Sequence, residues 1–414
     1  MKETREVLLT SDTSGESWSA AMWDPLTGSM LSQFRNASPL ASNAMQLLNV
    51  SYLLAADATK PRIHIWPVNS QVPLSNLRLT TPGKVSAMSC TSCGTYIAAS
   101  VDEKVFIWQT STGRLLRTLA RHYQTVTCLK FSLDSSHLAS GGQDGLVFVY
   151  SVARVINNYK EANPLHGFSD HTLAVKGIYF GAFGARCRVV TVSLDRTARI
   201  YDANSGVQLL TLVFDVPLTS VCLDKRECNM FVGCTNGHIR QFDLRNPPRG
   251  QEHHVPGDKE EKGNTFKGHT NGITNLSVSI DCVTLVSGGA DGTVNIWNIP
   301  SRQIIRSIQH KGGITNVLLV PHHSNFDVNL LNPKVLVKPL QRIDNEGAND
   351  ILAIVKHGED DLLNPQEFFE ESGEGHGNGE MEKKLSESRA EIERLRKINS
   401  EMYKYAVRGV LHKE

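Results

Sequence analysis

The fold is decided by a stretch that occurs twice. Residues 131–152 read FSLDSSHLASGGQDGLVFVYSV, and residues 278–299 read VSIDCVTLVSGGADGTVNIWNI, without a gap between the two patterns. Both contain a Gly-Gly pair followed by an Asp-Gly pair, at Asp144-Gly145 and at Asp291-Gly292. Apolar residues alternate on both sides of Asp-Gly, which predicts two short strands joined by a tight turn. We therefore expect an all-β protein built from repeats.

Weaker copies of this unit recur along the chain. An Asp stands six residues before an aromatic residue four times, at Asp102/Trp108, Asp144/Tyr150, Asp195/Tyr201 and Asp291/Trp297. A His precedes the Asp by 22 residues at His122 and His269, and by 24 residues at His171. A hydroxyl residue stands four residues before the Asp at Ser140, Thr191 and Ser287. The repeat thus contains a recurring set of polar residues in addition to its alternating apolar residues.

The pattern resembles the WD repeat, most closely in Lys267-Gly268-His269 and Ile296-Trp297-Asn298. In that family each repeat forms most of one four-stranded propeller blade. The resemblance implies that the Asp caps a turn and accepts a hydrogen bond from the His, which the hydroxyl and the Trp orient. The implied structural network comprises His122, Ser140, Asp144, His171, Thr191, Asp195, His269, Ser287, Asp291 and Trp297. Because the set recurs, we interpret it as structural and not as a catalytic triad, which would occur once.

Counting the aromatic-centred third strands predicts seven blades. They are centred on Trp23, Trp66, Trp108, Tyr150, Tyr201, Phe242 and Trp297. The first unit has three strands, near 6–11, 18–24 and 30–35, but no room for an inner strand before them. Residues 314–320 have the pattern of an inner strand, but no second, third or fourth strand follows them. We therefore expect them to complete the first blade. The prediction is a closed seven-bladed β-propeller over residues 1–320. Closure removes the exposed sheet edges that an open ring would have.

Composition limits the classes of function. The chain has 414 residues, of which 40% are hydrophobic, and a formal net charge of +1, which excludes a globally basic nucleic-acid-binding protein. No apolar run is long enough to cross a bilayer and no signal peptide is evident, so we expect a soluble intracellular protein. Among the eight cysteines only Cys90 and Cys93 have metal-like spacing, and no second ligand pair follows. We predict no catalytic residue, metal or cofactor.

The residues after the propeller divide into three segments. We expect a surface extension over 321–356 and an acidic, Gly-rich linker over 357–380. Residues 381–408 are rich in helix formers and predict an amphipathic, coiled-coil-like helix. Its a and d positions hold Leu385, Ile392, Leu395 and Met402. We expect this helix to form a homodimer or to dock on a partner, with packing on its own propeller as the alternative.

Several phrases go beyond a generic WD repeat, among them Ser193-Leu194-Asp195-Arg196-Thr197 and Leu395-Arg396-Lys397-Ile398-Asn399. With the length and the C-terminal helix, they resemble the WD-repeat subunit of the fungal Rix complex and its animal counterparts. This resemblance implies a non-enzymatic scaffold subunit of a nuclear complex that matures the large (60S) ribosomal subunit and processes the pre-rRNA spacer. The implied partners are the helical scaffold proline-, glutamic acid- and leucine-rich protein 1, testis-expressed protein 10, the midasin ATPase and the pre-60S particle. The implied location is the nucleus, in nucleolus and nucleoplasm, with the cytoplasm left open.

Three alternatives compete with this interpretation. Phe242-Asp243-Leu244-Arg245 is close to the Trp-Asp-x-Arg box of substrate receptors for cullin ubiquitin ligases, but it lacks the Trp. An enzyme would need titratable groups on inner strands, and Ile273 to Val278 carries only Thr, Asn and Ser between its apolar residues. Direct contact with RNA is left open by the sequence, because the basic residues of one region straddle several strands. These residues are Lys104, Arg114, Arg117, Arg121 and Lys130.

Overall fold

The structure is a computed structural model. It describes residues 6–342, apart from residues 17, 158–162, 183, 185–186, 249, 257–263, 329–330, 332 and 334, and it also describes residues 394 and 397. The chain divides into two compact units, Met1–Glu346 and Gly347–Glu414. All the described strands lie in the first unit. No helix within the described ranges is long and apolar enough to span a membrane.

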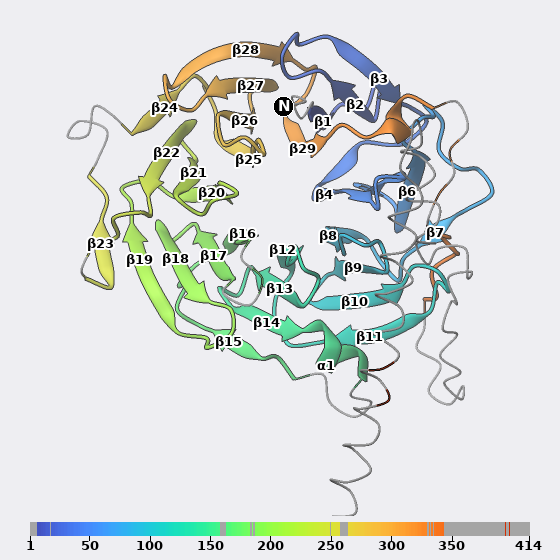
Figure 1. The fold of residues 1–414 in the computed structure, drawn as a ribbon, viewed down its shortest axis with the longest axis horizontal. Coiled ribbons are helices and arrows are strands. Elements are labelled where there is room, and N and C mark those ends of the chain that lie inside the picture. Colours follow the sequence, from blue (N-terminus) through green and yellow to red (C-terminus); the bar gives the residue numbers. More distant parts are fainter. Residues whose placement is uncertain are drawn as a thin grey trace, which may run out of the picture. The chain divides into compact units, whose positions relative to one another are not determined.

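The first unit is a ring of seven sheets around a central channel, so the predicted seven-bladed β-propeller is confirmed (Figure 1). Each blade has four main strands, counted here from the channel outward. Blade 1 has β29 (Ile314–Pro321), β1 (Glu6–Asp12), β2 (Ala20–Trp23) and β3 (Met30–Phe34). Blade 2 has β4 (Leu40–Leu48), β5 (Tyr52–Asp57), β6 (Arg62–Pro67) and β7 (Leu79–Thr80). Blade 3 has β8 (Val85–Cys90), β9 (Tyr96–Val101), β10 (Lys104–Gln109) and β11 (Leu115–Leu119).

The remaining blades follow the same order. Blade 4 has β12 (Val126–Phe131), β13 (His137–Gly142), β14 (Val147–Ser151) and β15 (His166–Phe168). Blade 5 has β16 (Val175–Phe180), β17 (Arg188–Ser193), β18 (Thr197–Asp202) and β19 (Gln208–Val213). Blade 6 has β20 (Leu218–Leu223), β21 (Asn229–Cys234), β22 (His238–Asp243) and β24 (Thr265–Lys267). Blade 7 has β25 (Ile273–Val278), β26 (Thr284–Gly289), β27 (Thr293–Asn298) and β28 (Gln303–Gln309).

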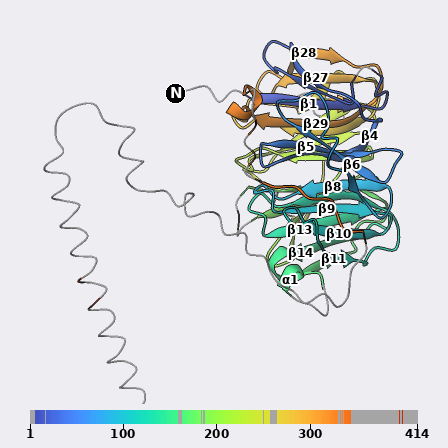
Figure 2. The same ribbon diagram turned by 90° about the vertical axis from the view of Figure 1, so that its right-hand side faces the viewer.

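The ring closes through strands from opposite ends of the propeller sequence. Strand β1 pairs antiparallel with β29, from Glu6 opposite Pro321 to Asp12 opposite Ile314. Figure 2 shows these two strands side by side. The inner strand of blade 1 therefore comes from the end of the repeat region, which joins the first and last repeats and leaves β1 without a free edge.

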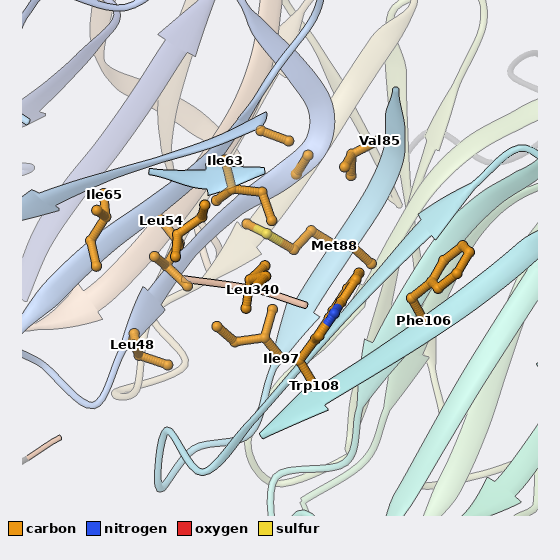
Figure 3. Packing of buried hydrophobic residues seen from close by; sticks show 14 of the residues in the cluster. Leu48, Leu54, Ile63, Ile65, Val85, Met88, Ile97, Phe106, Trp108 and Leu340 are labelled. Carbon is orange, nitrogen blue, oxygen red and sulfur yellow. The ribbon is translucent and has the colours of Figure 1, made fainter. Parts of the chain in front are cut away.

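The core lies between neighbouring blades and is organised by the third-strand aromatics. The indoles of Trp66, Trp108 and Trp297 and the phenols of Tyr150 and Tyr201 are almost fully buried. Figure 3 shows the cluster between blades 2 and 3, where Trp108 lies with aliphatic residues of both blades. Burying a large apolar side chain contributes roughly 1.5–3 kcal/mol, so these layers supply much of the stability of the ring.

One strand was not predicted from the sequence. Residues Glu252–His254 form β23, which pairs in parallel with the outer edge of β19 and gives blade 5 a fifth strand. A short helix, α1 (Val152–Asn157), follows β14, and a 3₁₀ turn spans Ser324–Phe326. These elements come from long-range pairing or local turns and leave no periodic pattern in the sequence.

The described part of the predicted extension packs on the propeller. The amide of Gln341 donates to the carbonyl of Gly113 at 2.8 Å, and the amide of Lys338 donates to the carbonyl of Thr110 at 3.2 Å. Leu340 is 5% exposed and enters the core between blades 2 and 3 (Figure 3). We name residues 335–342 the strap, because they run from one blade to the next.

The predicted C-terminal helix is described at two residues only. Arg394 and Lys397 are helical and exposed. The predicted contact residues Leu385, Ile392, Leu395 and Met402 lie outside the described residues.

Candidate functional site

The predicted network of blade 7 is assembled around His269. Its Nδ1 lies 3.2 Å from both carboxylate oxygens of Asp291, and its Nε2 lies 2.7 Å from the Ser287 hydroxyl. The Trp297 indole donates to the same hydroxyl at 2.8 Å. Asp291 also accepts hydrogen bonds from the amides of Thr270 and Thr293. The network thus ties the loop before the inner strand to the Asp-Gly turn and to the third strand.

The electrostatics of this network follow from burial. Burial lowers the pKa of the His269 imidazole, although the Asp291 carboxylate acts in the opposite direction. Burial acts to raise the pKa of Asp291, but hydrogen bonds from Thr293 and Thr270 outweigh it and lower the pKa. A neutral imidazole that donates to a carboxylate and contacts a hydroxyl is a stable structural arrangement.

Blade 4 brings the predicted residues together in the same way. His122 lies 3.0 Å from Asp144 and 2.9 Å from the Ser140 hydroxyl. The turn itself requires glycine, because Gly145 has a φ of +77° and an added Cβ would lie 2.5 Å from the His171 carbonyl oxygen.

In blade 5, His171 lies 2.8 Å from Asp195 and 2.8 Å from Thr191. The Tyr201 hydroxyl instead donates to Asp170 at 2.9 Å. The aromatic residue of this blade therefore uses a partner outside the His–Asp set.

A fourth network was missed by the sequence analysis because the ring closure divides it. The Trp23 indole donates to Thr10 at 2.8 Å, and the same hydroxyl lies 3.3 Å from His310. The other ring nitrogen of His310 lies 3.6 Å from Asp12. The His is at the end of the repeat region and the Asp at its beginning, so a search along the chain cannot pair them. Treating the sequence as circular would have brought them together.

Blade 3 departs from the pattern although the spacing is kept. Asp102 is exposed, has a φ of +51°, and lies in a turn of two residues between Val101 and Lys104. It therefore does not occupy the position of Asp144 or Asp291. Asp102 is six residues before Trp108 only because the turn between the two strands is short. Its carboxylate does not cap the turn as Asp144 and Asp291 do.

The imidazoles of the complete networks are inaccessible. The side chains of His122, His171 and His269 are at most 1% exposed. A general base must reach the proton that it removes, so groups buried in this way have no route to a substrate in this structure. Their recurrence in separate blades indicates a structural role in each.

The remaining residues of interest lie apart from one another. His254 in β23 contacts Glu252 at 3.5 Å, and within the described part of the chain no three His, Cys, Asp or Glu side chains gather as metal ligands. The Arg245 guanidinium is paired with Asp243 at 2.8 Å. Lys104 is exposed at a turn, whereas Lys130 lines the central channel, so the basic cluster in the sequence does not form one surface.

The central channel is a concave feature of the described propeller. It forms a cavity of about 690 Å³ that residues of six blades line. Lys130, Lys176 and Lys225 contribute to its wall, together with apolar residues of the inner strands. Pockets of this size are typical of sites for small ligands or short peptide segments. Sequence analysis named Lys130 among basic residues that straddle several strands, and it did not single out Lys176 or Lys225.

The repeat is confirmed by comparison with known families. The family model described as WD domain, G-beta repeat matches residues 113–151 and 260–298. These segments contain the central strands of blade 4 and of blade 7. With the closed ring and its His–Asp networks, they define a WD-repeat β-propeller protein.

Similarity over most of the chain narrows this class. WD repeat-containing protein 18 of Danio rerio is 32% identical over 424 residues, covering 97% of this chain and 97% of that protein. The human protein of the same name is 38% identical over 325 residues, covering 78% of this chain and 74% of that protein. The chain belongs to the WD repeat-containing protein 18 family. A more distant relative, pre-rRNA-processing protein IPI3 of Yarrowia lipolytica, is 28% identical over 349 residues, covering 80% of each chain.

Proposed function

We propose that this protein acts in pre-rRNA processing, as a WD-repeat subunit of the machinery that matures the large ribosomal subunit. The observation that carries the proposal is its similarity, over most of the chain, to the WD repeat-containing protein 18 family and to a protein named for pre-rRNA processing. The large-subunit assignment and the spacer-processing step come from the resemblance to the Rix-complex subunit. The ring fold supports this role, because a propeller presents many loops on a rigid frame.

The role that fits the structure is that of a scaffold without enzymatic activity. The recurrent His, Asp and hydroxyl sets are buried and already hydrogen-bonded within their blades. The channel wall presents lysines, hydroxyl groups and apolar side chains, and its carboxylates, Glu6 and Asp224, accept hydrogen bonds from backbone amides. Such a surface is suited to binding other proteins.

The proposed partners follow from the Rix-type resemblance. They are a large helical-repeat scaffold, testis-expressed protein 10, the midasin ATPase and the pre-60S particle, met in the nucleolus and nucleoplasm. We also propose that the helix predicted over 381–408 supplies a homodimer contact or docks on the helical scaffold. Ribosome assembly takes place mainly in the nucleus, which is the location that the names of the relatives favour.

Depletion and rescue test this function. Removing the protein from cells should raise the level of large-subunit precursors that retain the internal spacer, while small-subunit precursors stay unchanged. Re-expression of the full chain should restore processing. Unchanged levels of spacer-containing precursors after complete depletion would contradict the proposal.

Affinity purification separates the proposal from the ubiquitin-ligase alternative. The tagged protein should enrich pre-60S proteins and the helical scaffold. Enrichment of a cullin adaptor in place of ribosomal precursors would favour a substrate receptor. The local structure gives no support to that alternative, because Arg245 of the degenerate box is already paired with Asp243.

A further inference from the structure

The wall of the channel repeats one backbone feature from blade to blade. In six blades the inner strand has a β-bulge at its second residue, where the pairing with the second strand shifts by one position. A bulge re-aims the side chain of the extra residue. Five of the six bulge residues carry a hydroxyl and one carries an ammonium group. They are Ser86, Thr127, Lys176, Thr219, Thr274 and Thr315.

Three of the hydroxyls join neighbouring inner strands. Ser86 donates to the carbonyl of Val126 at 2.7 Å, and Thr219 donates to the carbonyl of Ile273 at 2.5 Å. Thr127 donates to the carbonyl of Val175 in the same way. Blade 5 has a lysine at this position, Lys176, whereas Thr274 and Thr315 keep the hydroxyl but hydrogen-bond within their own blades. Among these six bulge residues, Lys176 is the one that places a charged group at the channel wall.

Two further lysines line the same cavity. Lys130 is the fifth residue of β12, where the equivalent residues of β8 and β25 are Ser89 and Ser277. Lys225 follows β20 and is exposed. Within the described part of the chain, none of the three ammonium groups takes part in an ion pair. Burial lowers the pKa of Lys130, and the nearby charge of Lys225 acts in the same direction.

The carboxylates of the cavity already accept hydrogen bonds from other groups of the protein. Glu6 accepts a hydrogen bond from the amide of Ile280 at 2.8 Å. Asp224 accepts from the amide of Cys228 at 2.7 Å and from Asn229 at 3.0 Å. The part of the wall that blades 4 and 5 supply contains Lys130 and Lys176 and no carboxylate. That side of the channel is therefore positive and has unused hydrogen-bond donors.

Apolar groups accompany the lysines. Leu133 is 56% exposed and Ile280 is 41% exposed, and both line the cavity. They lie in the turns that follow β12 and β25, in blades 4 and 7. Exposed aliphatic side chains at a concave, positive site favour a ligand that is both acidic and apolar.

We propose that the central channel binds an extended acidic segment of a partner protein, whose carboxylates contact Lys176 and Lys130 and whose apolar side chains contact Leu133 and Ile280. This inference does not rest on the role in pre-rRNA processing, since it concerns the chemistry of the channel alone. Single-stranded nucleic acid fits less well, because it needs exposed aromatic groups for base stacking. Phe131 and Phe180 line the channel but are 5% and 6% exposed, and Tyr179, which also lines it, is half-buried and packs against two core clusters.

A peptide with the proposed chemistry tests the site. The probe is a fluorescein-labelled octapeptide in which Asp and Leu alternate, and its binding to the full-length protein is followed by fluorescence anisotropy. We expect saturable binding to the wild type. Lys176→Thr restores the residue type of the other bulges, so the fold should tolerate it, and binding should weaken about tenfold with the loss of one charged contact. Lys130→Ser should act in the same direction.

Matched controls keep the result specific. Lys104→Thr removes an exposed lysine outside the cavity and should leave binding unchanged. Ile280→Ser should weaken binding, and an octapeptide of alternating Lys and Leu should not bind. The proposal is overturned if the wild type shows no saturable binding, or if Lys176→Thr with Lys130→Ser binds the probe as well as the wild type. Tighter, lysine-dependent binding of polyuridylate or inositol hexakisphosphate would assign the channel to a phosphate ligand instead.

Discussion

The indole Nε1 of Trp108 donates a 2.7 Å hydrogen bond to the carbonyl oxygen of Gln341, a residue of the strap. In blade 7 the equivalent indole uses the Ser287 hydroxyl, two residues beyond its strand partner Leu285. In blade 3 the same position is Ala99, which has no hydroxyl. The strap therefore supplies the acceptor that the blade lacks.

The strap should stabilise blades 2 and 3. Leu340→Ala removes a buried side chain from the cluster in Figure 3 and should lower the free energy of unfolding by about 2–4 kcal/mol. Urea denaturation measures the change. Leu336→Ala is the matched control, because Leu336 is 71% exposed and should alter stability little. Equal destabilisation by both variants would mean that the strap has no specific place in the core.

The blade 7 network should contribute to stability through Asp291. Asp291→Ala leaves the buried His269 without its carboxylate and should cost about 1–3 kcal/mol. Asp243→Ala removes an exposed carboxylate paired with Arg245 and should have a much smaller effect. Thermal unfolding compares the two variants with the wild type. Identical midpoints for the wild type and Asp291→Ala would show that the network is not stabilising.

Ring closure should depend on Asn316 of β29. Its amide donates to the Ser11 hydroxyl at 2.9 Å and to the Ala41 carbonyl at 2.8 Å, and its carbonyl accepts from the Ala44 amide at 3.0 Å. Asn316→Ala leaves buried polar groups without partners and should cost about 1–3 kcal/mol. Chemical denaturation should show a lower midpoint. Exposed Asn271→Ala serves as the control, and the prediction fails if both variants unfold at the same concentration.

Acid should destabilise the propeller through its buried histidines. Burial lowers the pKa values of His122 and His269, so the folded state binds fewer protons than the unfolded state. Their contribution is complete above the unfolded pKa of about 6.5 and declines as the pH falls below it, by at most about 1.4 kcal/mol per pH unit for each histidine. The lowered pKa of Asp291 extends the decline below about pH 4.

Urea titrations between neutral and acidic pH measure this slope. His269→Gln should be less stable at neutral pH but should lose part of the pH dependence. His254→Gln, at a side chain that is 77% exposed, should keep the wild-type slope. A stability that does not change below about pH 6.5 would contradict the prediction.

The predicted C-terminal helix should mediate association. Four apolar positions on one stripe, Leu385, Ile392, Leu395 and Met402, could sustain a micromolar contact after the cost of ordering. Replacing Ile392 and Leu395 by Asp should reduce the mass measured by light scattering, or abolish capture of the helical scaffold, without changing propeller unfolding. A double variant that keeps both properties would assign the helix no role in association.

Sequence alone was sufficient for the number of blades and for the approximate positions of the strands of blade 1. The reason is local, since the alternation of apolar residues and the Asp-Gly turns recur within each unit. The His–Asp sets of blades 4, 5 and 7 could also be found, because each lies within one continuous stretch. The closure by residues 314–320 followed from counting strands, and β29 lies where that count requires it.

Only the tertiary structure decided which hydrogen-bond acceptors lie near the buried aromatic residues and which side chains line the channel. Gln341 reaches Trp108 across 233 positions of sequence, and His310 reaches Thr10 across 300. The strand β23 and the positions of the channel lysines likewise depend on elements that are not adjacent in the sequence. The periodicity of the sequence carries no information on these contacts. The two residues of each contact are far apart in the sequence, and only the folded ring brings them together.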